Sequence, residues 1–155
     1  MNGEIRRAEP EDFADLIDMG REFLHQSGNG AFTTFDEPSF SATIISLMSG
    51  VNNASLLVAS SAGQVVGMAA SVVFPFYANM NTKIAQEIFW YCKPDFRNGF
   101  GAALLDELEA DAQRKGADVF MSAAIAGLRD GAIARVYERR GYKPAENIFL
   151  RKLSS

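Results

Sequence analysis

The stretch from Glu87 to Gly116 constrains this chain more than any other. It begins with the apolar run Ile88 to Cys92, breaks at Pro94, passes through a basic, glycine-rich turn and then becomes amphipathic. This order predicts a buried strand, a tight turn and a helix. Backbone N–H groups at a helix N-terminus lack internal partners, and the helix dipole adds about half a positive charge there. The stretch therefore predicts a phosphate-binding turn.

Six residues of this turn are candidates for contacting the phosphate groups of a ligand: Arg97, Asn98, Gly99, Phe100, Gly101 and Ala102. A dinucleotide fingerprint requires a third glycine inside an early βαβ unit, and this turn has neither. No Gly-Lys-Ser or Gly-Lys-Thr occurs, so a triphosphate P-loop is also unsupported. The glycine turn by itself leaves the ligand open.

A second segment, Arg129 to Tyr142, narrows the choice. It predicts a helix that carries Tyr137 and ends at Gly141. Together the two segments resemble the GNAT acetyltransferase superfamily, which moves an acyl group from coenzyme A to an amine. That family has the pyrophosphate motif Arg/Gln-x-x-Gly-x-Gly/Ala and a later helix with Asn-x-x-Ala-x-x-x-Tyr-x-x-x-Gly-Phe/Tyr. The resemblance covers the whole chain in element order, but its specific residues lie between Glu87 and Tyr142.

The pyrophosphate motif fits in two registers. If Gly99 and Gly101 are the motif glycines, Phe96 takes the arginine position. If Arg97 opens the motif, a phenylalanine replaces a glycine and an alanine closes it. We prefer the first register because residues 103–105 then fall in step with the family's helix. The loop is one residue short in either case, so main-chain contacts are expected before side-chain contacts.

The resemblance also suggests contacts for the pantetheine arm of coenzyme A. Asp130 stands where the family often has asparagine, and a carboxylate cannot donate a hydrogen bond as an amide does. The backbone of Cys92 is expected to pair with pantetheine, since this strand splays from its neighbour in the family. Trp90, on the same strand face as Cys92, is a candidate for the acyl pocket, with core packing as the alternative.

Acyl transfer to an amine requires a base for the amine, a donor for the oxyanion and an acid for the leaving thiolate. The resemblance places Tyr137 beside the coenzyme A sulfur, which makes it the candidate acid; the alternative is a packing role. Glu87 is the candidate base, because some family members carry a glutamate base on this strand. An exposed strand residue and a water-relayed base are the alternatives. Cys92 is disfavoured as a nucleophile because the sequence offers it no paired histidine.

Composition sets the class of protein. A chain of 155 residues and 16.9 kDa predicts a single domain over residues 1–155. A net charge of −4 argues against nonspecific nucleic-acid binding. One cysteine predicts no internal disulfide and fits a reducing cytoplasm, and one histidine predicts no metal site. The sequence shows neither a signal pattern nor a membrane-length apolar run.

Hydrophobic periodicity predicts the element order β-α-α-β-β-β-α-β-α-β. The expected strands are residues 4–8, 55–60, 65–73, 83–92, 118–123 and 148–152. The expected class is α/β, with a GNAT-like mixed, mostly antiparallel central sheet flanked by helices on both faces.

The resemblance implies an N-acetyltransferase, and the single cysteine fits a cytoplasmic one. By the resemblance, it would move an acetyl group from acetyl-CoA to a primary amine by direct attack in a ternary complex. Two other functions stay open: a coenzyme A-binding sensor without turnover, and a nicotinamide-dependent oxidoreductase, which the missing third glycine weakens. The acceptor is not identified, and the apolar last strand suggests a homodimer.

Overall fold

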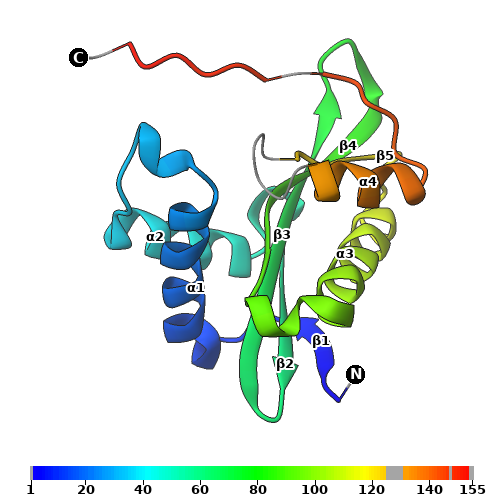
Figure 1. Cartoon of the computed structure of the whole chain (residues 1–155). Helices are drawn as coiled ribbons and strands as arrows, with labels where there is room; N and C mark the ends of the chain where they lie inside the picture. The colour runs from blue at the N-terminus through cyan, green and yellow to red at the C-terminus, as the bar shows by residue number, and fades with distance from the viewer. Residues whose placement is uncertain (1, 125–130, 147, 154–155) are drawn as a thin grey trace.

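The computed structural model describes residues 2–124, 131–146 and 148–153 (Figure 1). The strands in this part of the chain are β1 (Glu4–Arg7), β2 (Ser55–Ser61), β3 (Gln64–Phe76), β4 (Asn79–Cys92) and β5 (Val119–Met121). The α-helices are α1 (Phe13–Gln26), α2 (Glu37–Met48), α3 (Arg97–Arg114) and α4 (Ala132–Arg139). No helix among the described residues is both long and apolar enough to span a bilayer.

The strands form one sheet in the order β1-β2-β3-β4-β5. Neighbouring strands from β1 to β4 are antiparallel, whereas β5 runs parallel to β4. Helices α1 and α2 lie on one face of the sheet and α3 lies on the other (Figure 1). The predicted fold class, a mixed and mostly antiparallel sheet with helices on both faces, is therefore confirmed.

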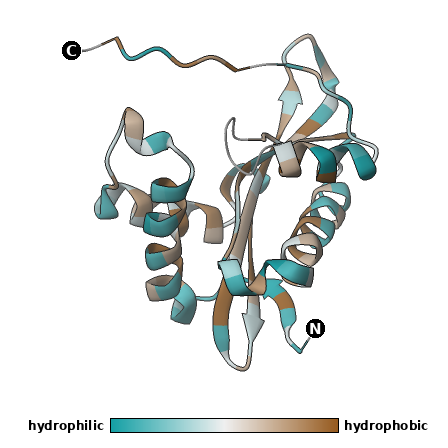
Figure 2. Ribbon diagram, viewed as in Figure 1, coloured by the Kyte–Doolittle hydropathy of each residue, from teal (hydrophilic) through white to brown (hydrophobic). Residues whose placement is uncertain are grey.

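Two apolar cores hold the layers together, one on each face of the sheet. The first core includes Leu16, Met19, Ile44, Leu47, Met68, Phe89 and Tyr91, and the second includes Leu57, Val66, Ala69, Cys92, Leu104 and Leu108. Figure 2 shows hydrophobic residues along the central strands, while the helices alternate between hydrophilic and hydrophobic residues. Such alternation is what a helix needs to cover a sheet on one side and face water on the other.

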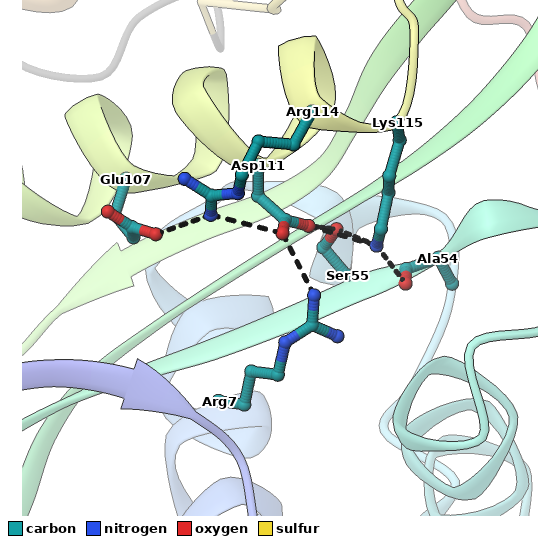
Figure 3. Close-up of polar contacts among 7 residues, drawn as sticks. All are labelled: Arg7, Ala54, Ser55, Glu107, Asp111, Arg114 and Lys115. Atoms are coloured by element: carbon teal, nitrogen blue, oxygen red, sulfur yellow. Dashed lines mark hydrogen bonds and ion pairs between the residues drawn. The ribbon is translucent and has the colours of Figure 1, made fainter.

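A buried carboxylate on α3 fastens that helix to β1 and β2 (Figure 3). Asp111 is only 2% exposed. It accepts a hydrogen bond from the Ser55 hydroxyl and pairs with Lys115 Nζ and Arg7 Nη2, each at 2.9 Å. Burial opposes ionisation, but the hydrogen bonds from Ser55 and Lys115 outweigh it, and the pKa of Asp111 falls to about 2. The charged network thus fixes where α3 crosses the sheet.

The structure differs from the expected elements in two places. The strands expected at residues 65–73 and 83–92 are longer in the structure, where β3 and β4 run on as one long hairpin whose tip carries the exposed Tyr77. The expected strand over residues 148–152 is wrong. These residues have no strand partner, and Figure 1 shows the segment leaving the body of the protein. The apolar run Ile148 to Leu150 predicts an extended chain, but a strand also needs a neighbour to pair with.

Candidate active site

A β-bulge in β4 decides which way the candidate base points. The register of β4 against β3 shifts between Phe89 and Glu87, which leaves Ile88 as an extra residue. Strand residues alternate between faces, so an extra residue switches the face of everything beyond it. Phe89 packs in the core under α1 and α2, whereas Trp90 packs on the α3 side. Without the bulge Glu87 would face α1 and α2; with it, Glu87 lies on the same side as Trp90.

On that side Glu87 meets two hydroxyl groups. Tyr137 Oη donates to Glu87 Oε2 at 3.0 Å, and Ser122 Oγ donates to the same oxygen at 2.6 Å. Burial raises the pKa of Glu87, and the hydrogen bonds from Ser122 and Tyr137 offset part of this rise. Burial and the charge of Glu87 also raise the pKa of Tyr137. The pair therefore joins a protonated phenol to a carboxylate whose affinity for a proton is increased.

The backbone edge of β4 beside this pair is open. β5 pairs only with Ile84 to Gln86, so in the described chain the rest of β4 has no strand neighbour on that side. One edge group is already used, because Arg97 Nε donates to the Cys92 carbonyl oxygen at 3.0 Å. An open strand edge offers N–H and C=O groups to an extended ligand that carries amides. This is the splayed strand that the family resemblance implied.

The glycine turn forms the start of α3. Asn98 has ψ 103° and Gly99 has φ 99°, so the regular helix begins at Phe100. A positive φ of this size favours glycine, which supports Gly99 as a turn residue. The Phe100 side chain is buried in the α3 core, so only its main chain can face a ligand. Gly101 accepts a hydrogen bond from Trp90 Nε1 at 2.9 Å, which ties the turn to β4.

The side chains of Arg97 and Cys92, two predicted site residues, both form hydrogen bonds within the protein. Besides its bond to the Cys92 carbonyl, Arg97 donates through Nη2 to Gln26 Oε1 at 2.8 Å, which joins the turn to the end of α1. Burial raises the pKa of the Cys92 thiol to about 11, although the charge of Arg97 opposes the rise. A thiol with this pKa stays protonated near neutral pH and is a poor nucleophile.

Two cavities meet beside the Glu87–Tyr137 pair. The first has a volume of about 230 Å³ and is lined by the glycine turn, the end of β4, the end of α1 and one face of α4. The second has a volume of about 190 Å³ and is lined by Glu87 and Tyr137. Phe23, Trp90 and Ile133 line both cavities. A site with two adjoining chambers and an acid–base pair at one of them suits a reaction between two substrates.

The structure places most of the predicted site residues together. Those lining the cavities are Glu87, Trp90, Cys92, Arg97, Gly101, Ala102 and Tyr137. Asn98 and Gly99 form the adjoining turn, and Phe100 points away from it into the core. Asp130 lies outside the described residues. Among the described residues, no group of three or more His, Cys, Asp or Glu side chains is arranged to hold a metal ion.

Sequence reasoning missed two parts of the site. The cavity residues Phe23, Gln26 and Ser27 come from the end of α1 and the residue after it, and no motif marks them. Gln26 lies 65 residues before its hydrogen-bond partner Tyr91 in β4. Ser122 follows β5, and a lone serine carries no signal. Ile133 could have been found, because it lies four residues before Tyr137 and therefore on the same helix face.

Comparison with known proteins identifies the family of this chain. The model of the acetyltransferase (GNAT) family matches residues 21–142, and the chain therefore belongs to that family. This stretch contains every residue that lines the two cavities. A search of curated proteins found no match.

Solved structures share the fold at low sequence identity. A "transcriptional regulator" from Bacillus halodurans C-125 is 18% identical with a TM-score of 0.77, over 98% of this chain and 100% of that one. A "predicted acetyltransferase" from Clostridium acetobutylicum, solved with acetyl-CoA, is 18% identical with a TM-score of 0.76, over 97% and 96% of the two chains. AAC(6')-Iy, in complex with a bisubstrate analogue, is 13% identical with a TM-score of 0.79 over the full length of both chains.

Proposed function

We propose that the protein transfers an acetyl group from acetyl-CoA to a primary amine by direct attack in a ternary complex. The observation that carries this proposal is the Glu87–Tyr137 hydrogen bond, 3.0 Å long, beside the wall shared by two cavities. The structural neighbours add support. One was solved with acetyl-CoA, and another with the bisubstrate analogue CoA-S-monomethyl-acetylneamine.

The first cavity is assigned to the donor. The main-chain N–H groups that follow Gly99 point from a helix N-terminus, where a pyrophosphate is favoured. The open edge of β4 near Trp90 offers hydrogen bonds to the amides of pantetheine. The apolar faces of Trp90 and Ile133 continue the wall toward the second cavity. Asp130 remains a candidate contact to pantetheine.

The second cavity is assigned to the acceptor. Glu87 is the carboxylate on its wall, and Phe23, Ile88 and Ile133 supply apolar surface. A carboxylate among apolar groups favours a cationic amine. An ordinary lysine-like amine has a pKa near 10.4, so only roughly one molecule in two thousand is neutral at pH 7. Glu87 is proposed as the base that removes the proton, because it lies on the wall of this cavity and burial raises its pKa.

The chemical step then needs one bond made and one broken. The neutral amine attacks the thioester carbon, the C–N bond forms, and the C–S bond breaks. Glu87 passes the first proton, taken from the ammonium group, to solvent before the attack. The nitrogen then loses its second proton to Glu87, the thiolate gains one from Tyr137, and Glu87 reprotonates the phenolate. Removal of a positioned acid or base typically lowers the rate by about 10² to 10⁴.

A binding and turnover experiment tests this proposal. The thermal shift of the protein is measured with acetyl-CoA, coenzyme A and NAD. Ligand at about 100 times its dissociation constant adds roughly 2.7 kcal/mol, which is several degrees for a domain of this size. Release of coenzyme A is then followed with a panel of amines. We expect a shift with both coenzyme A species but not with NAD, and turnover that falls about 10² to 10⁴-fold in Tyr137→Phe.

Tyr142→Phe is the matched control, because this neighbouring ring lies 5.0 Å from that of Tyr137 but its hydroxyl donates to Glu109. It should retain turnover. Binding of acetyl-CoA without turnover on any amine would instead favour the coenzyme A-binding module. If neither acetyl-CoA nor coenzyme A shifts the melting temperature, the proposed acyltransferase activity is refuted.

Two further expectations belong to this proposal. We expect the protein to act in the cytoplasm, as its single free cysteine suits a reducing compartment. We also expect a homodimer. The exposed apolar side chains of Ile148, Phe149, Leu150 and Leu153 support an interaction surface there.

A further inference from the structure

The hydroxyl proton of Tyr137 points at the carboxylate of Glu87 rather than at free space. A phenol has a single proton to donate. In the structure the Tyr137 hydroxyl has two acceptors, Glu87 Oε2 at 3.0 Å and the Ala123 carbonyl oxygen at 3.4 Å. The shorter contact is to a carboxylate, and hydrogen bonds to a charged group are the stronger ones. While Glu87 is ionised, Tyr137 is therefore not free to protonate a thiolate.

Ser122 reinforces this arrangement from the other side. Its hydroxyl donates to the same oxygen, Glu87 Oε2, at 2.6 Å. Among the described residues no donor contacts Oε1, which leaves that oxygen to receive a proton from the acceptor. Ser122 comes directly after β5, and Tyr137 lies on α4. The carboxylate is thus held between two elements, with Oε2 bound by two donors and Oε1 bound by none from the described residues.

We propose that Ser122, Glu87 and Tyr137 form one proton relay, in which Ser122 positions the carboxylate and Tyr137 can act as an acid only after Glu87 has been protonated. The relay rests on the acetyltransferase function proposed above. The amine proton moves to Glu87 Oε1, and the neutral carboxyl group holds the Tyr137 hydroxyl more weakly. Tyr137 then gives its proton to the sulfur, and Glu87 returns the amine proton to the phenolate. The net change is one proton moved from nitrogen to sulfur.

Among the described residues, the ionisable groups around Glu87 are Tyr137 and, beyond it, Tyr142, Arg140 and Glu109. Ser71 lies opposite Glu87 in the strand ladder. The hydrogen bonds to Glu87 come from Ser122 and Tyr137. Apart from burial, the ionisation of Glu87 should therefore respond chiefly to these two donors.

The first test needs no turnover. The Glu87 carboxyl carbon is titrated by ¹³C NMR in the wild type, Ser122→Ala and Ser122→Thr, with Glu87→Gln used to assign the signal. A hydrogen bond to the carboxylate lowers its pKa, so Ser122→Ala should raise the pKa and Ser122→Thr should restore it. Ser71→Ala is the matched control. Ser71 lies opposite Glu87 in the ladder but is buried with no hydrogen-bond partner among the described residues, so its loss should leave the titration unchanged.

The second test uses turnover. Independent acid and base roles predict that Glu87→Gln/Tyr137→Phe loses activity by the product of the two single losses. The relay predicts that the double variant is about as slow as the slower single variant. It also predicts that Ser122→Ala moves the acidic limb of the pH–rate profile upward. Multiplicative losses, or a titration unaffected by Ser122→Ala, would overturn the relay. An inactive wild type would instead refute the proposed acetyltransferase activity. The NMR titration would still show whether Ser122 controls the pKa of Glu87.

Discussion

Replacing Asp111 by asparagine should destabilise the protein measurably at neutral pH and much less in acid. The pKa of Asp111 falls from its ordinary value of 3.8 to about 2 in the folded protein. One pKa unit corresponds to 1.36 kcal/mol, so ionised Asp111 should add about 2 kcal/mol of stability. Because the folded pKa is the lower one, this contribution is complete above pH 3.8 and is lost as the pH falls through about 2. About half should remain at pH 3.

Urea unfolding of the wild type and Asp111→Asn between pH 7 and pH 3 measures this. The free energy of unfolding of Asp111→Asn should be about 2 kcal/mol or more below that of the wild type at pH 7, because Lys115 also loses its buried partner. The gap should narrow by about 1 kcal/mol at pH 3. Asp106→Asn is the control on the same helix, since its carboxylate is largely exposed and surface pairs contribute little. A gap that is equal at both pH values would refute this account of the network in Figure 3.

Three shorter predictions concern glycines and the thiol. A Cβ at Gly20 would lie 2.2 Å from the Phe40 ring, so Gly20→Ala should cost about 1–3 kcal/mol in urea unfolding, whereas Gly30→Ala, with open space around it, should not. Gly99→Ala should cost about 1–2 kcal/mol because of the φ of 99°, and the reasoning fails if its unfolding midpoint equals that of the wild type. Incubation with acetyl-CoA alone should leave the intact mass unchanged, because the Cys92 thiol, with a pKa of about 11, stays protonated. A mass gain that Cys92→Ala abolishes would contradict this.

Much of the site was predictable because its signals are local. The positive φ of Gly99, the start of α3 and the face of α4 that carries Tyr137 all follow from residues within one or two turns of each other. The order of the elements follows from hydrophobic periodicity for the same reason. The family resemblance added what spacing alone could not, namely coenzyme A as the expected ligand and a base on the strand before the turn.

The partners of Glu87 could not be predicted, because they depend on strand pairing. The extra residue Ile88 in β4 is defined only against β3, and it alone turns Glu87 to the side of Trp90 and Tyr137. Ser122 reaches the same carboxylate because β5 lies beside β4, although 35 residues separate the two side chains in the chain. Likewise, the apolar run at residues 148–150 predicts an extended conformation but cannot supply the neighbour that a strand requires. Local sequence determined the elements and the chemistry that they carry, whereas the register between strands decided which of those groups meet, because pairing joins residues that no short-range pattern connects.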